Sequence, residues 1–120
     1  MIEDVRLLSQ SVSEMADQLG DSFRRPVSLA LALGDMGGTW ETFSKILSST
    51  NLLVNTEDVS EYSIDDFRKS FTKVDPLFAD VKDLYIVKIV NALAQGYIEE
   101  LYMVSKKLTY ELDDRYKIPY

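Results

Sequence analysis

The sequence has no cysteine and no histidine among its 120 residues. The absence of cysteine excludes disulfide bonds, thiolate metal sites and a cysteine nucleophile. The absence of histidine removes the commonest general base and the commonest ligand of transition metals. The sequence therefore predicts no catalytic residue, no cofactor-binding residue and no metal ligand. We expect a protein that is not an enzyme and that needs no cofactor.

Positive charge is also scarce. Thirteen basic residues stand against twenty acidic ones, which gives a formal net charge of −7. This balance disfavours direct binding to nucleic-acid phosphates or to an anionic membrane surface. It favours solubility, or attraction to a basic protein partner. Arg24 and Arg25 form a compact basic spot that is suited to a carboxylate or a phosphate, although a surface pair after the first helix is the more ordinary interpretation.

Long apolar runs are missing as well. The longest weakly charged run, residues 84–98, is interrupted by Lys88 and is shorter than a membrane-spanning helix. Within it, Lys88 and Gln95 mark one narrow polar strip on an otherwise apolar helix, which is typical of the middle of a bundle. The acidic start of the chain does not resemble a signal peptide. We therefore expect no membrane contact and a cytoplasmic location.

Glycine is rare, and three of the five glycines fall within residues 34–40, GDMGGTW. This segment lacks the lysine of a phosphate-binding loop and the spacing of a dinucleotide fingerprint. We interpret it as a hinge between two helices. In this hinge Gly37 and Gly38 supply unusual backbone angles and Thr39 caps the next helix.

Helical periodicity is what the sequence does contain. A strand needs a partner strand, and the sequence shows no convincing pair of strand patterns. We therefore expect an all-α single domain over residues 1–120. It should be a bundle of about five helices with a long C-terminal helix. The first helix, residues 2–19, has apolar residues on one face. These are Ile2, Val5, Leu8, Val12, Met15, Ala16 and Leu19.

Two shorter helices are expected next, over residues 26–35 and 40–49. The first also alternates like a strand, but its alanines favour a helix. Residues 51–62 are expected to form a long connection whose start, from Leu52 to Val54, enters the core. The second of the two helices is expected to turn four side chains inward, namely Trp40, Phe43, Ile46 and Leu47.

Cap residues mark the following boundaries. Ser63 and Asp66 resemble a capping box that opens the fourth helix. Asp75 and Pro76 together restart the chain, the first as a cap and the second as a first-turn residue.

The C-terminal stretch is the basis of the functional prediction. From Pro76 to residue 117 only Gly96 interrupts a helical sequence, and a continuous helix of about 40 residues would be about 60 Å long. Either the helix breaks near Gly96 or residues 97–117 project beyond the core, and continuity is slightly favoured. Glu111–Arg115 and Asp113–Lys117 are expected ion pairs. An apolar stripe follows Gly96 and consists of Ile98, Leu101, Tyr102, Leu108, Leu112 and Tyr116.

A stripe of this kind needs cover from a second protein surface. We therefore predict a non-catalytic protein–protein interaction module, such as an adaptor, an assembly factor or an inhibitory subunit, that forms a homodimer through these six residues. An alternative is an acidic mimic of nucleic acid that blocks a basic protein channel. A metal-dependent enzyme built on carboxylates and a helical dimer on membranes are weaker alternatives.

Overall fold

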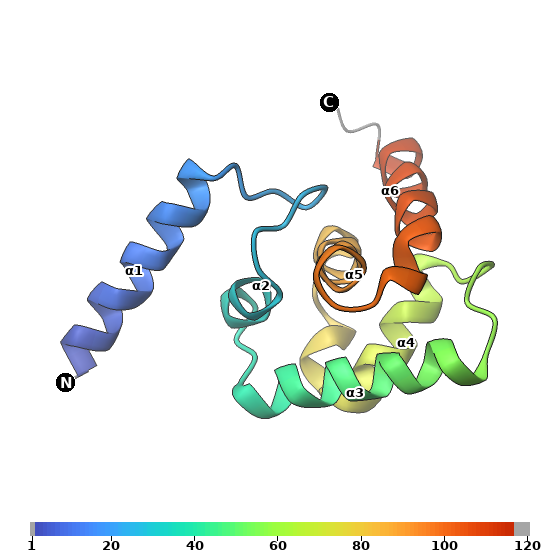
Figure 1. Ribbon diagram of the computed structural model, residues 1–120, viewed down its shortest axis with the longest axis horizontal. Helices are drawn as coiled ribbons and strands as arrows, with labels where there is room; N and C mark the ends of the chain where they lie inside the picture. The colour runs from blue at the N-terminus through green and yellow to red at the C-terminus, as the bar shows by residue number, and fades with distance from the viewer. Residues whose placement is uncertain (1, 117–120) are drawn as a thin grey trace.

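All regular secondary structure in the described part of the protein is helical (Figure 1). The computed structural model describes residues 2–116, and side chains from residue 5 onward; within this part there is no strand, which confirms the all-α prediction. None of these helices has both the length and the apolar content that crossing a bilayer requires. In chain order the elements are α1 (Ile2–Gln18), α2 (Leu29–Asp35), α3 (Trp40–Thr56), α4 (Ile64–Val74), the 3-10 helix η1 (Pro76–Ala79), α5 (Asp83–Gly96), the 3-10 helix η2 (Glu99–Leu101) and α6 (Tyr102–Tyr116).

Side-chain caps set the boundaries of the central helices. Thr39 opens α3 and Ser63 opens α4, each in a capping box, because the cap hydroxyl accepts from a backbone N–H and the side chain three residues on accepts from the cap N–H. Asp75 ends α4 and caps η1, whose first residue is Pro76. These contacts confirm the caps that were predicted at Thr39, Ser63 and Asp75.

The segment between α2 and α3 is a short turn, and of the two glycines expected to have unusual backbone angles only Gly37 has a positive φ. Gly37 has φ of +89°, a left-handed conformation that glycine adopts without strain. Gly38 packs against the preceding turn, where an added Cβ would lie 2.9 Å from the carbonyl oxygen of Leu33. The two glycines therefore let the chain leave α2 and enter α3 within a few residues.

One hydrophobic core joins α2 to α6, and α5 lies at its centre, packed against α2, α4 and α6 (Figure 1). The buried residues of α5 run from Ile86 to Ala94, which confirms the interpretation of this segment as the middle of a bundle. Beneath α5, the fully buried rings of Phe67, Phe71 and Phe78 form a row with centroid separations of 5.9 and 5.4 Å. This core fixes the positions of the surfaces described below.

Two helix boundaries differ from the prediction. The helix expected from residue 26 begins at Leu29, because the preceding residues form a bent loop and the Ser28 side chain supplies the cap. The helix expected to end at residue 49 continues to Thr56, since Leu53 and Val54 keep the helical register while they pack on the core.

Two side chains that were expected inside lie outside. Trp40 is 76% exposed and Leu52 is 64% exposed. Trp40 is the first residue of α3, beyond the edge of the core, and Leu52 lies on the outer face of the helix that Leu53 and Val54 anchor.

The prediction of one long C-terminal helix is wrong. α5 ends at Gly96, and the N–H of Ile98 donates to the carbonyl of Leu93 over 2.7 Å, so the chain turns. The turn carries Ile98 and Leu101 into the core, whereas a straight continuation would carry them past it. As a result, the described part of residues 97–117 folds back as α6 against α5 and does not project (Figure 1).

Ion pairs on α6 follow the prediction in part. The Arg115 guanidinium and the Glu111 carboxylate pair at 3.0 Å, as expected. Asp113 pairs with Arg24, far away in the chain. Its predicted partner Lys117 lies outside the described residues, as does the side chain of Ile2.

Candidate functional site

The six residues predicted to form a partner interface divide between the core and the surface. Tyr102 and Tyr116 are exposed. The other four are at most 3% exposed and belong to the hydrophobic core, namely Ile98, Leu101, Leu108 and Leu112. The chain itself covers these aliphatic side chains. They are therefore not accessible to a partner protein.

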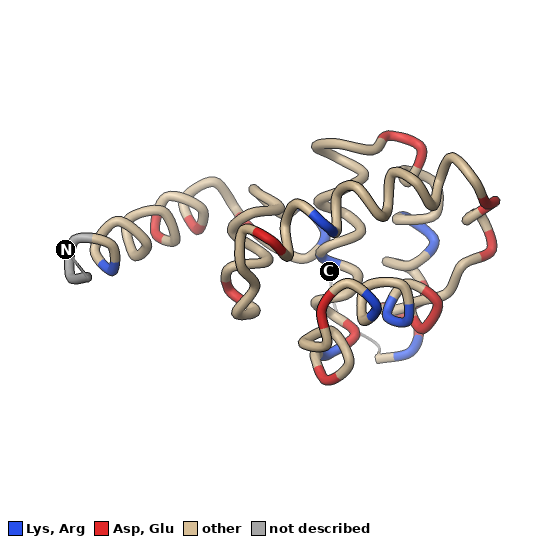
Figure 2. The backbone as a smooth tube through the Cα atoms, turned by 90° about the horizontal axis from the view of Figure 1, so that it is seen from below, with Lys and Arg blue, Asp and Glu red and all other residues tan. Residues whose placement is uncertain are grey.

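An uncovered apolar face is found instead on α1. Figures 1 and 2 show α1 running apart from the other helices, and none of its described side chains belongs to the shared core. Ala16 is the one buried member of the predicted face. The remaining described members are between 38% and 73% exposed, namely Val5, Leu8, Val12, Met15 and Leu19.

These five residues, called the α1 seam below, follow alternating steps of three and four. This is the spacing of the two inward positions of a coiled-coil heptad. Val5 and Val12 occupy one kind of inward position, and Leu8 and Met15 occupy the other. In parallel coiled coils, β-branched residues at the first position and leucine at the second favour two strands, and Val5, Leu8 and Val12 follow this rule whereas Met15 and Leu19 do not. The strict spacing is the sequence signal that could have drawn attention to the apolar face of α1.

The connection between α1 and the core is anchored. Residues 21–27, called the strap below, form a bent loop that lies along α5. The Asp21 carboxylate accepts from Lys88 Nζ at 2.9 Å and from the backbone N–H of Val27 at 2.9 Å. Burial raises the pKa of Asp21, but these two contacts outweigh it and hold the pKa below the ordinary value of 3.8. The strap therefore fixes the point at which α1 leaves the core.

Comparisons of the chain with protein-family models, with curated proteins and with solved structures find no match. Its function has to follow from its own surfaces.

A second exposed group is aromatic. The rings of Trp40 and Phe43 stack with centroids 5.1 Å apart, and Tyr97 meets Phe43 edge-on at 6.0 Å. The group joins the start of α3 to the residue after α5. Its rings contact one another, whereas the α1 seam has no such contacts among the described residues, although Trp40 itself is 76% exposed.

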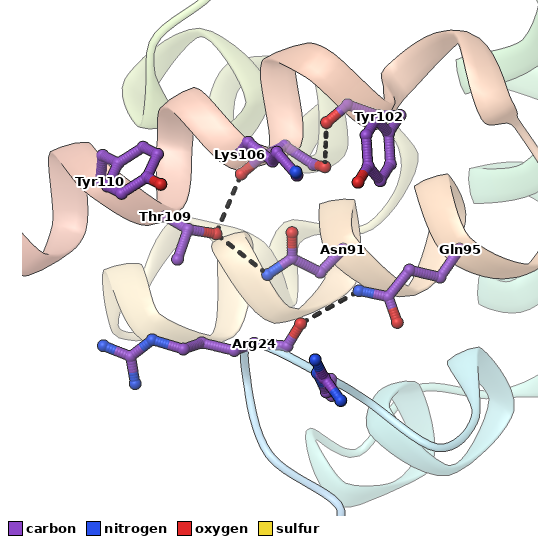
Figure 3. A pocket seen from close by; sticks show the side chains of 9 residues that line it. Arg24, Asn91, Gln95, Tyr102, Lys106, Thr109 and Tyr110 are labelled. Atoms are coloured by element: carbon purple, nitrogen blue, oxygen red, sulfur yellow. Dashed lines mark hydrogen bonds between the residues drawn. The ribbon is translucent and has the colours of Figure 1, made fainter. Parts of the chain in front are cut away.

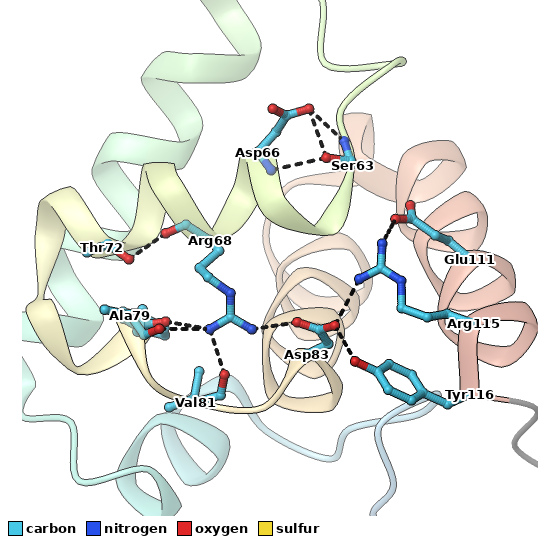
Figure 4. A network of polar contacts seen from close by, with 11 residues as sticks. Ser63, Asp66, Arg68, Thr72, Ala79, Val81, Asp83, Glu111, Arg115 and Tyr116 are labelled. Carbon is cyan, nitrogen blue, oxygen red and sulfur yellow. Dashed lines mark hydrogen bonds and ion pairs between the residues drawn. The ribbon is translucent and has the colours of Figure 1, made fainter.

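The densest cluster of charges has a structural role (Figure 4). The Asp83 carboxylate, at the start of α5, accepts from Arg68 at 2.6 Å, from Arg115 at 2.9 Å and from the Tyr116 hydroxyl at 2.8 Å. Arg68 also donates to the carbonyl of Val81 at 2.6 Å. Burial raises the pKa of Asp83, but the three hydrogen bonds outweigh it and the pKa lies below 3.8. The cluster joins α4, α5 and α6.

Carboxylates do not converge in the way that a metal ion needs. Within residues 2–116, no group of three or more acidic side chains is placed to hold one. Asp66, for example, is engaged in the cap of α4, where its carboxylate accepts from the Ser63 N–H at 2.9 Å. The predicted basic spot also divides, since Arg24 pairs with Asp113 and Arg25 is exposed.

Proposed function

We propose that this chain is a non-catalytic protein–protein interaction module that associates with a second copy of itself through α1. The observation that carries the proposal is the α1 seam, a heptad-spaced row of apolar side chains that the rest of the described chain leaves uncovered. The role expected from the sequence is kept, with its cytoplasmic setting, but the docking element moves from α6 to α1.

The physics of a lone helix supports the proposal. Helices in proteins draw most of their stability from packing an amphipathic face, and a helix of this length is marginal by itself in water. α1 has 17 residues, or about 25 Å at 1.5 Å per residue. Covering its apolar face would stabilise both the helix and the association.

Charge along α1 suits a partner with the same sequence. The positions that flank the seam between residues 9 and 18 are uncharged: they are Ser9, Ser11, Ala16 and Gln18. Two acidic chains can therefore bring these helices together without like charges meeting across the seam. Because the seam spans only about two heptads, we expect a reversible dimer that forms at micromolar concentrations.

The test compares two neighbouring leucines. Leu8 lies in the seam at 65% exposure and Leu7 lies beside it at 69% exposure, so neither substitution should unfold the chain. We expect sedimentation equilibrium to show a dimer for the wild type and for Leu7→Lys, and a monomer for Leu8→Lys. Circular dichroism of all three proteins checks that the helices persist.

A wild-type chain that stays monomeric at several hundred micromolar, or an equal loss of dimer in both variants, would contradict the proposal. Salt separates it from the alternative of a nucleic-acid mimic. An apolar seam holds at high ionic strength, whereas an acidic surface loses a basic partner there. The acidic segment 57–66 supports the alternative less, because Asp58 and Asp66 already make local hydrogen bonds and Glu61 pairs with Lys107.

A further inference from the structure

A groove of unusual composition lies between the strap, α5 and α6 (Figure 3). Its volume is about 520 Å³, within the range of pockets that hold small ligands. Three of its lining residues are basic and none is acidic, although the chain as a whole has twenty acidic residues and thirteen basic ones. Such a lining concentrates positive potential at one place on an acidic protein.

The walls of the groove are fixed by two amide side chains of α5. Asn91 Nδ2 donates to the carbonyl of Phe23 at 2.7 Å. Gln95 Nε2 donates to the carbonyl of Arg24 at 3.0 Å (Figure 3). Asn91 also donates to the Thr109 hydroxyl on α6 at 3.3 Å. The strap and α6 are thus held on either side of α5, and the groove exists before any ligand enters.

The two adjacent arginines have different surroundings. The Arg24 guanidinium pairs with the partly buried Asp113 carboxylate and lies 4.4 Å from the ring centroid of Phe23. Arg25 is exposed, and its side chain forms no ion pair with any described residue. Arg24 therefore serves the fold, and Arg25 offers its charge to the groove.

The opposite wall presents a second cation between two aromatic rings. Tyr102, Lys106 and Tyr110 follow at four-residue steps on α6, with Lys106 between the two tyrosines (Figure 3). Lys106 Nζ lies 4.6 Å from the ring centroid of Tyr102. Interaction with Tyr102 raises the pKa of Lys106, so the ammonium group keeps its charge at neutral pH.

We propose that this groove binds a small phosphate-bearing ligand, with Arg25 and Lys106 holding the phosphate. Two cations match the roughly two negative charges of a phosphomonoester at neutral pH. A guanidinium can donate two parallel hydrogen bonds to phosphate oxygens, and an ammonium group adds a point charge. Tyr102 and Tyr110 offer apolar ring surface to the organic part of such a ligand.

The proposal is tested by titrating the full chain with inorganic phosphate and, separately, with phenyl phosphate at constant ionic strength. We expect saturable shifts of the backbone amide signals of Arg25, Lys106 and Tyr110. Tighter binding of phenyl phosphate identifies a monoester as the natural ligand, and equal affinity identifies free phosphate. The absence of a saturable shift with either probe up to about 10 mM overturns the proposal.

Paired variants separate the groove from general electrostatics. The double variant Arg25→Gln/Lys106→Gln should bind at least about tenfold more weakly, because charge-assisted hydrogen bonds are lost. Lys69→Gln/Lys73→Gln removes the same charge from exposed positions of α4 and should bind as the wild type does. An equal loss in both double variants overturns the proposal.

Discussion

Among single residues, Asp83 connects three helices, since it lies in α5 and accepts from α4 once and from α6 twice. Asp83→Asn removes a charge that two arginines share, and the Asp83 and Arg68 side chains are only 14% and 19% exposed. We expect the free energy of unfolding to fall by about 2–4 kcal/mol. Urea denaturation measures it, with Asp114→Asn on the exposed side of α6 as a control that should change stability by less than about 0.5 kcal/mol.

The same carboxylate predicts a dependence on pH. The folded pKa of Asp83 lies below the unfolded value of 3.8, so the unfolded chain binds more protons between the two values and stability rises with pH there. The contribution of Asp83 is therefore complete above about pH 5 and is lost as the pH falls through the folded pKa. The stability difference between wild type and Asp83→Asn should be constant from pH 7 to about 5 and shrink below 3.8. A difference that grows in acid would contradict this.

Whether a side-chain contact could be predicted from the sequence depends on how far apart its two residues lie in the chain. The caps at Thr39 and Ser63 could be predicted, because each cap and the residue it pairs with are three positions apart. The Asp83 cluster could not, because Arg68 and Tyr116 come from separate helices whose packing no local pattern specifies.

At the scale of whole helices, burial changes what a substitution on α6 should do. Leu108 is fully buried, so Leu108→Lys should place a charge in the core and unfold the chain, and it should not merely separate a dimer. We expect a loss of more than about 3 kcal/mol, seen as a lower midpoint of thermal unfolding by circular dichroism. Tyr110→Lys, at an exposed position of the same helix, should leave the midpoint within a few degrees.

The sequence indicated correctly which helices have an apolar face, but it did not indicate which of these faces pack against the rest of the chain. Periodicity shows that a helix has an apolar face and does not show which surface meets that face. The stripe after Gly96 is covered because the turn at Ile98 folds α6 onto α5. The equally regular face of α1 stays uncovered, because the strap carries the chain away from that helix and into the core.

For the molecule as a whole, we expect the core to fold without α1. No described side chain of α1 belongs to the hydrophobic core, so a chain lacking residues 1–18 should fold and unfold cooperatively. The truncated chain should be monomeric, with an unfolding midpoint that does not depend on protein concentration. The full chain should show a midpoint that rises with concentration, because association stabilises the folded state. Loss of folding in the truncated chain would contradict this division.

The position of Trp40 has a practical consequence for following these reactions by light. It is the only tryptophan and is 76% exposed, with one face on Phe43. Its indole already emits from an aqueous environment in the native protein, so denaturation will scarcely move the emission wavelength even as every helix is lost. The fluorophore is instead a reporter of contact, and a blue shift will signal that some other molecule has covered the start of α3.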